Sequence, residues 1–167
     1  MSAVHNMLIR TINTIYLQAA GVSERGTPQD KADFVEYALL WADVVEGHHH
    51  IEETSYFPEI ERLADAPGIM QPNVDQHHAF QPGLAAYSAY LKDVSAGTES
   101  PFDGARLTNI LDQFMPVLTQ HLHDEIQTLR GLGAYEDKTD WKKWSHGHTK
   151  AILDKAMADP GWKVSSQ

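Results

Sequence analysis

The sequence predicts an all-α protein, an up-down-up-down four-helix bundle with an additional short helix near its C-terminus. Apolar residues recur at steps of three and four over long stretches, and turn-forming residues separate these stretches. With 167 residues, the chain is long enough for one domain with a real core and four or five helices of ordinary length. We expect the bundle over residues 1–133 and an extension over residues 134–167 that packs on it.

The first half of the chain predicts two helices. The first is expected over about 2–20, with Ser2 as its N-cap and Gly21 closing it. After the loop VSERGTPQD, the second begins near residues 28–31, where a proline is tolerated, and runs to about residues 63–64. It is expected to be the longest helix of the protein.

The second half predicts two more bundle helices and a short tail helix. The third follows the turn-rich stretch DAPGIMQP, is capped by Asn73 or Asp75, and ends near residue 95. The fourth covers about residues 105–132 and is followed by a tail helix near residues 143–158. The tail also carries three tryptophans, which suit either a lid on the flank of the bundle or a partner surface: Trp141, Trp144 and Trp162.

Composition excludes several classes of function. The absence of cysteine removes disulfides, thiolate metal sites and cysteine nucleophiles. A formal net charge of −10 disfavours binding to nucleic acids and to anionic membranes. No segment has the long apolar run of a membrane span, and the N-terminal stretch lacks the pattern of a secretory signal. We therefore expect a soluble, cytoplasmic protein.

Histidine is followed by an acidic residue four positions later three times, at 48/52, 49/53 and 121/125, where chance predicts about 1.4 such pairs from ten histidines and 23 acidic residues. Residues four apart share one face of a helix, so both can reach one centre between packed helices. His49 and Glu53 interrupt the apolar seam of one predicted helix, and His121 and Glu125 interrupt that of another. These two pairs are therefore expected to point inward.

Two lone histidines, His5 and His77, begin apolar stripes on the other two predicted helices. Buried polar groups left unpaired cost about 2–7 kcal/mol each, so six of them in one core require mutual compensation. A metal cluster supplies that compensation, whereas the alternative is a set of satisfied core histidines with two carboxylates in ion pairs. Imidazole with carboxylate suits iron, manganese or zinc, and four-helix bundles can hold two iron or manganese ions.

The segments that carry these residues resemble the hemerythrin-like HHE cation-binding family, most closely its small fungal members. The resemblance covers about residues 4–132 through HNMLIR, HHHIEETSYFPEIE, QHHAF and HLHDEI. It implies a four-helix bundle around two non-haem iron ions, with dioxygen as ligand or co-substrate. It also implies terminal histidine ligands and bridging carboxylates, which are His5, His49, His77 and His121 with Glu53 and Glu125.

One departure from the family pattern bears on function. Oxygen-carrying hemerythrins have HxxxH on the third helix, whereas Gln81 stands at the second of those positions here. The expected set is then four histidines and two carboxylates, against five and two in a carrier. Fewer protein ligands leave more exchangeable positions on the metal, which favours oxidative chemistry over storage. Water, Gln81 or a neighbouring acid is the alternative occupant of the gap.

Residues near the expected ligands are candidates for orienting them or replacing them: Glu46, His50, His78, Gln81 and Asp124. Glu46 shares the face of His49, and the alternative for it is a solvated carboxylate. His48 and Glu52 are expected to form a surface pair, and three other histidines are expected to face solvent, namely His123, His146 and His148. The apolar wall of the site is expected from three aromatic residues: Phe57, Phe80 and Phe114.

The leading hypothesis is a di-iron oxidoreductase or oxygenase that activates dioxygen and acts on a small organic substrate. Manganese or a mixed pair would suit the same ligands. The first alternative is a hemerythrin-like protein that binds oxygen or iron for storage, delivery or sensing without turnover. The second is a helical interaction module with structural zinc, which is disfavoured because such sites usually take four ligands and often thiolates.

Overall fold

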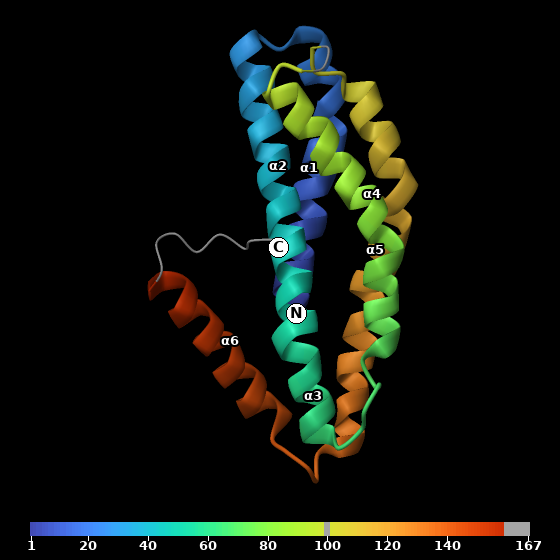
Figure 1. The fold of residues 1–167 in the computed structure, drawn as a ribbon, viewed down its shortest axis with the longest axis vertical. Helices are drawn as coiled ribbons and strands as arrows, with labels where there is room; N and C mark the ends of the chain where they lie inside the picture. The colour runs from blue at the N-terminus through green and yellow to red at the C-terminus, as the bar shows by residue number, and fades with distance from the viewer. Residues whose placement is uncertain (99–100, 159–167) are drawn as a thin grey trace.

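The computed structural model describes residues 1–98 and 101–158, which form helices and connecting turns and contain no strand (Figure 1). Four long helices make up the bundle: α1 (Ser2–Arg25), α2 (Pro28–Ile51), α4 (Gln71–Ser95) and α5 (Gly104–Gly131). A π turn, η1 (Glu52–Tyr56), joins α2 to α3 (Phe57–Ala64), and a 3-10 turn, η2 (Leu132–Tyr135), follows α5. The expected all-α bundle with an extra C-terminal helix is confirmed. Within the described residues, no helix is both long enough and apolar enough to cross a membrane.

The ends of the helices follow local chemistry. α1 continues through Gly21, which was expected to end it, and stops only at Gly26. The last turns are held because Val22 packs against the core and the Ser23 hydroxyl donates to the Phe102 carbonyl over 3.1 Å. α2 begins at Pro28 behind a complete capping box, in which Thr27 and Asp30 hydrogen-bond each other's backbone N–H groups.

The predicted second helix is helical throughout, but the π turn η1 divides it into α2 and α3. There the Phe57 N–H donates to the Glu52 carbonyl, five residues back instead of four. The wider turn adds one residue between Glu52 and Phe57, so that Glu52, Tyr56, Phe57 and Ile60 are all buried. Of this set, regular helical spacing did not predict the burial of Glu52, and π turns of this kind occur frequently at functional sites.

The apolar core has two parts, with polar residues between them. The larger cluster fills the bundle from Ala19 to Leu8 on α1 and from Phe34 to Val45 on α2. The smaller one lies around Tyr56, Ile60 and Leu132. Along each bundle helix, buried histidine or glutamate separates the two clusters. This polar layer is where the candidate site lies.

α6 (Trp141–Ala158) lies outside the bundle. It leaves the end of the bundle near η2 and runs back along one side, diverging from α2 (Figure 1). Its first turns reach η1, where the rings of Tyr56 and Trp144 lie 4.9 Å apart. Trp141 and Trp144 therefore do contact the bundle, whereas Trp162 lies outside the described residues.

Candidate metal centre

Seven side chains in the polar layer form two groups of potential metal ligands. The first group contains His49, Glu52, His77 and His121, and the second contains His5, His48, Glu52 and Glu125. Within each group, one donor atom from every residue lies within 4.8 Å of the others. Glu52 belongs to both groups. The arrangement suits two cations side by side with one carboxylate between them.

His48 and Glu52 are part of this layer, so the expectation that they form a surface pair is wrong. Glu52 is 1% exposed, and the side chain of His48 is 11% exposed. At 100° per residue, Glu52 projects between the two histidines, about 40° from His48 and about 60° from His49. Both histidines can therefore face inward if each serves a different centre, with Glu52 shared between the centres.

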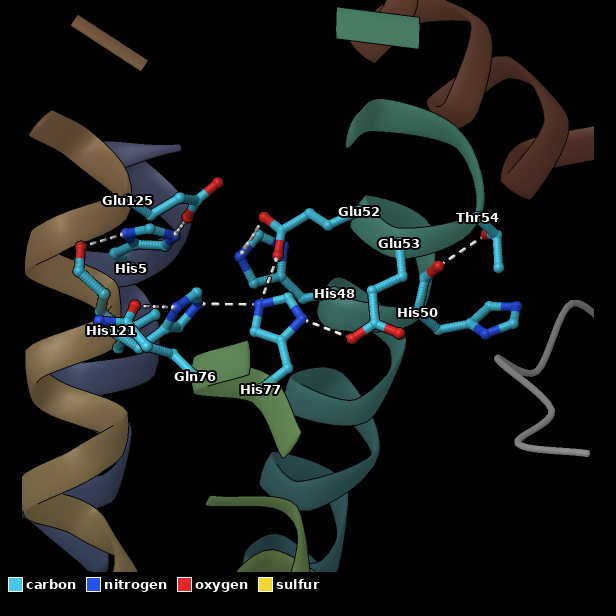
Figure 2. A network of polar contacts seen from close by, with 11 residues as sticks. His5, His48, His50, Glu52, Glu53, Thr54, Gln76, His77, His121 and Glu125 are labelled. Carbon is cyan, nitrogen blue, oxygen red and sulfur yellow. Dashed lines mark hydrogen bonds and ion pairs between the residues drawn. The ribbon is translucent and has the colours of Figure 1, made fainter. Parts of the chain in front are cut away.

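Three of the histidines are held in place by hydrogen bonds from their Nδ1 atoms, the ring nitrogens that face away from the site (Figure 2). The Nδ1 of His5 donates to the carbonyl of Leu122 at 2.9 Å, and that of His77 donates to a Glu53 carboxylate oxygen at 2.6 Å. The Nδ1 of His121 lies 3.2 Å from Oε1 of Gln76. Because these oxygens act as acceptors, the proton of each neutral ring is on Nδ1. Each Nε2 then presents a lone pair to the site, as ligating histidines do.

These lone pairs face one another at short range. The Nε2 atoms of His77 and His121 lie 3.1 Å apart, and the Nε2 of His5 lies 2.9 Å from Oε2 of Glu125. Such contacts are favourable only with a proton or a metal cation between the two atoms. Two nitrogens bound at about 2.1 Å at right angles on one octahedral ion would be about 3.0 Å apart. The spacing of His77 and His121 matches that value.

Other buried ligand atoms have no hydrogen-bond partner outside the ligand groups. The two ring nitrogens of His49 have none at all. Nε2 of His48 and the carboxylate oxygens of Glu52 and Glu125 meet only other ligand residues, as in the 3.1 Å contact between His48 and Glu52. Buried polar atoms are rarely left without a partner, because the loss of hydration costs about 1–3 kcal/mol each. So many in one layer indicate that the donor set is built around a ligand.

Burial also shifts the protonation of these groups, and for the histidines the shift favours metal binding. Burial, with repulsion from neighbouring histidines, lowers the pKa of His48 and of His121 to about 3. The same causes place the pKa of His49 well below its usual value. Burial and the nearby Glu125 raise the pKa of Glu52 well above its usual value. The imidazoles are therefore neutral near pH 7 and able to bind a metal.

Glu53 lies at the edge of the site and belongs to neither group. Its side chain is 35% exposed, and its carboxylate accepts the hydrogen bond from His77 (Figure 2). The structure therefore brings Glu52 to the position expected of Glu53 and gives Glu53 the task of orienting His77. Glu125, the other expected carboxylate, belongs to the second group. Only Glu52 is common to both groups.

A pocket of about 470 Å³ lies between α2 and α4 and reaches the first group. Both His49 and His77 line it, whereas His5, His48 and Glu125 do not. Four residues that the sequence suggested as orienting or replacement ligands also line it, namely Glu46, His50, His78 and Gln81. None of these four belongs to a ligand group. The Oε1 atom of Glu46 accepts a 3.4 Å hydrogen bond from Ser88 instead of contacting His49.

Asp124 points away from the ligand groups. It accepts a hydrogen bond from Nε2 of Gln76 at 2.9 Å, and Gln76 in turn contacts His121. Glu125, the next residue, is fully buried and lies in the second group. Asp124 thus acts on His121 through Gln76, and its own carboxylate is 38% exposed.

Two of the three expected aromatic residues wall the site. The ring of Phe57 stacks on His77 at 5.7 Å, and the ring of Phe80 lies 4.9 Å from that of His49. Phe114 belongs to the larger apolar cluster instead, where it packs against Gly83 and Tyr87. Of the histidines expected to face solvent, His123 and His146 are exposed, but His148 is half-buried against Tyr56.

Comparison with known proteins gives two matches. The model of the hemerythrin HHE cation-binding domain matches residues 1–132. The chain is also 38% identical over 148 residues to the dimeric xanthone biosynthesis cluster protein R11 of Cryptosporiopsis sp. (strain 8999). That alignment covers 86% of this chain but only 53% of the relative, so the chain spans about half the relative's length. No solved structure matches the chain.

Proposed function

Because the chain belongs to the hemerythrin HHE cation-binding family, we propose that it binds two non-haem iron ions and uses them to activate dioxygen for the oxidation of a small organic substrate. His49, His77 and His121 would hold one ion, and His5, His48 and Glu125 the other. Glu52 would bridge them. Iron bound there would supply the redox chemistry and Lewis acidity that dioxygen activation requires.

The pocket between α2 and α4 is the observation that carries the proposal of turnover. Its volume of about 470 Å³ falls in the usual range for small-molecule sites, and it opens on two residues of the first ligand group. Its walls include Phe80 and Leu84, while Glu46, Ser88 and Lys92 supply polar groups. A carrier of dioxygen alone needs no space of this size. The pocket suits an organic molecule with an apolar body and a few polar substituents.

The chain's own residues have definite tasks in this scheme. Glu53 and Gln76 hold the rings of His77 and His121 by their Nδ1 protons, which fixes both Nε2 atoms toward the first ion. Phe57 covers His77 and Phe80 covers His49, and both rings limit the access of water. Glu46 lines the pocket and would offer a carboxylate to accept a proton from a bound hydroxyl group.

The donor count favours the alternative, reversible binding of dioxygen. The absence of histidine at Gln81 suggested one ligand too few, but His48 restores a set of five histidines and two carboxylates. The family's carriers use that same number of ligands. The missing nitrogen of α4 is thus replaced by one from α2, and the argument from open metal positions loses force. The pocket, and a relative named for a biosynthesis cluster, favour turnover.

The test is metal analysis followed by oxygen chemistry. Protein purified without chelators is analysed for metal per chain, and visible spectra are recorded before and after anaerobic protein is exposed to air. An oxygen electrode then records uptake with a panel of small hydroxylated aromatic compounds, and mass spectrometry identifies products. We expect about two irons per chain, an oxygen-dependent band and a changed organic compound. A reversible band without product would indicate a carrier, and the absence of redox metal would refute both functions.

A further inference from the structure

A series of neighbouring aromatic rings connects the polar layer, which holds the candidate metal ligands, to α6. Tyr56 is 8% exposed and follows Glu52 by four residues, so both lie on one side of the π turn. The ring of Tyr56 lies 4.9 Å from that of Trp144, and the ring of Trp144 lies 5.8 Å from that of Trp141. Trp141 and Trp144 are half-exposed on the outside of the bundle. A buried phenol beside the polar layer is thus joined to the surface by two indoles, which meet edge to face.

Tyr56 is close enough to the ligands to feel their charge. Burial raises its pKa, and the carboxylates of Glu125 and Glu52 raise it further, while the hydrogen bond with Ser145 opposes them. The hydroxyl oxygens of Tyr56 and Ser145 lie 3.2 Å apart. Tyr56 is therefore a protonated phenol whose hydroxyl has a hydrogen-bond partner on α6.

We propose that Tyr56, Trp144 and Trp141 form an electron route between the metal pair and an external one-electron donor. The inference rests on the redox metal centre of the proposed function. When dioxygen has oxidised the metal pair beyond the ferric state, Tyr56 gives it one electron, and the phenol proton passes to Ser145 and on to water. Trp144 then reduces the Tyr56 radical, which regains a proton, and a donor such as ascorbate reduces Trp144 directly or through Trp141. The net change is one electron transferred and no proton consumed.

The proposed electron route lies apart from the substrate pocket. The pocket opens on His49 and His77 between α2 and α4, and neither Tyr56 nor a tryptophan lines it. An oxygenase must receive electrons as well as substrate, and a separate route delivers them while the pocket is filled. Phe57 and Phe80, the other rings against the site, are much harder to oxidise than tyrosine or tryptophan.

The bundle offers a matched control for this chain of rings. Trp41 and Tyr87 also form a tyrosine–tryptophan pair, with ring centroids 5.5 Å apart. Both are buried in the larger apolar cluster, at 2% and 0% exposure, and their polar atoms hydrogen-bond the backbone of Leu8 and Ala38. This pair reaches neither the ligand layer nor the surface, so its loss has no effect on the route.

The experiment measures the rate at which ascorbate bleaches the transient visible band that forms when reduced, metal-loaded protein is mixed with dioxygen. Tyr56→Phe and Trp144→Phe are expected to slow bleaching several-fold, whereas Tyr87→Phe leaves the rate unchanged. Metal content and melting temperature are recorded for every variant. Freeze-quench electron paramagnetic resonance after photo-oxidation of the metal-free protein adds a second readout, in which Tyr56→Phe removes a tyrosyl signal and Tyr87→Phe does not.

The outcomes separate this route from the proposed function. If Tyr56→Phe and Trp144→Phe hold the full metal content, take up oxygen and are reduced by ascorbate as fast as the wild type, the route is refuted while the function stands. If the wild-type protein holds no redox metal, the proposed function fails first and the route fails with it.

Discussion

Glu52 and Glu53 are adjacent residues for which the structure predicts opposite effects on metal binding. Glu52 is buried and common to both ligand groups, whereas Glu53 is 35% exposed and only contacts His77. Glu52→Ala should therefore remove or weaken both metals, and Glu53→Ala should leave both in place. His121→Ala and His5→Ala each touch a single group and should each cost one metal.

The size of the effect follows from mass action. At free metal one hundred times its dissociation constant, one bound ion stabilises the folded state by about 2.7 kcal/mol. A chain of 167 residues changes its melting temperature by about 2–4 °C per kcal/mol. The loss of one metal should thus lower the melting temperature by about 5–11 °C, and the loss of both by about twice as much.

The assay is elemental analysis of each variant, paired with thermal melts in the presence of metal and after chelation. The chelated wild type sets the scale for the loss of both ions. Glu52→Gln, which keeps the volume of the side chain, replaces Glu52→Ala if the latter does not fold. Two metals and an unchanged melting temperature in both Glu52 variants would refute the bridging position. A loss in Glu53→Ala equal to that in Glu52→Ala would refute the distinction between the two residues.

Three further predictions test the pocket and the framework. Ala85→Phe should fill the pocket, lower turnover of an organic substrate and leave metal content unchanged, as measured by product formation and elemental analysis. Gly83→Ala should destabilise the fold by about 1–3 kcal/mol, seen in a denaturant melt, because the added Cβ would lie 2.3 Å from the Cβ of Phe114. Thr27→Ala should cost about 1 kcal/mol by removing the capping box of α2. Its effect should be greatest above the usual pKa of Asp30 and should shrink as the pH falls through the lowered folded-state pKa, because the bond from the Thr27 hydroxyl stabilises the charged carboxylate. The bond that Thr27 accepts from the Asp30 N–H is independent of this ionisation, so part of the effect should persist at low pH.

Apolar periodicity was sufficient to predict the four bundle helices, because each buries one regular stripe. The end of α1 was missed because Gly21 was read as a helix terminator. A glycine inside a helix costs only about 1 kcal/mol relative to alanine, and the packing of Val22 and the hydrogen bond of Ser23 compensate for it. Local signals cannot include such contacts with Phe102, which is 79 residues away from Ser23.

The ligand layer shows a different limit. His5, His49, His77, His121 and Glu125 were correctly expected to be buried together. The sequence reasoning allowed only one of the adjacent histidines His48 and His49 to face the site, although it expected two ions. Glu52 projects between these two histidines, so each can face a different ligand group that shares Glu52. Assigning one histidine to each expected ion was therefore the signal that would have identified His48.

The position of Glu52 also links the two sides of the site. It lies between the group that opens to the pocket and the group that is closed from it, and it is one π turn before Tyr56. Substrate on the His49 side and electrons on the Tyr56 side would then reach the same pair of ions from different directions. A variant that blocks the pocket, such as Ala85→Phe, should consequently leave the ascorbate reduction rate intact, while Tyr56→Phe should slow reduction without excluding substrate. If either variant changed both properties at constant metal content, the separation of the two paths would be refuted.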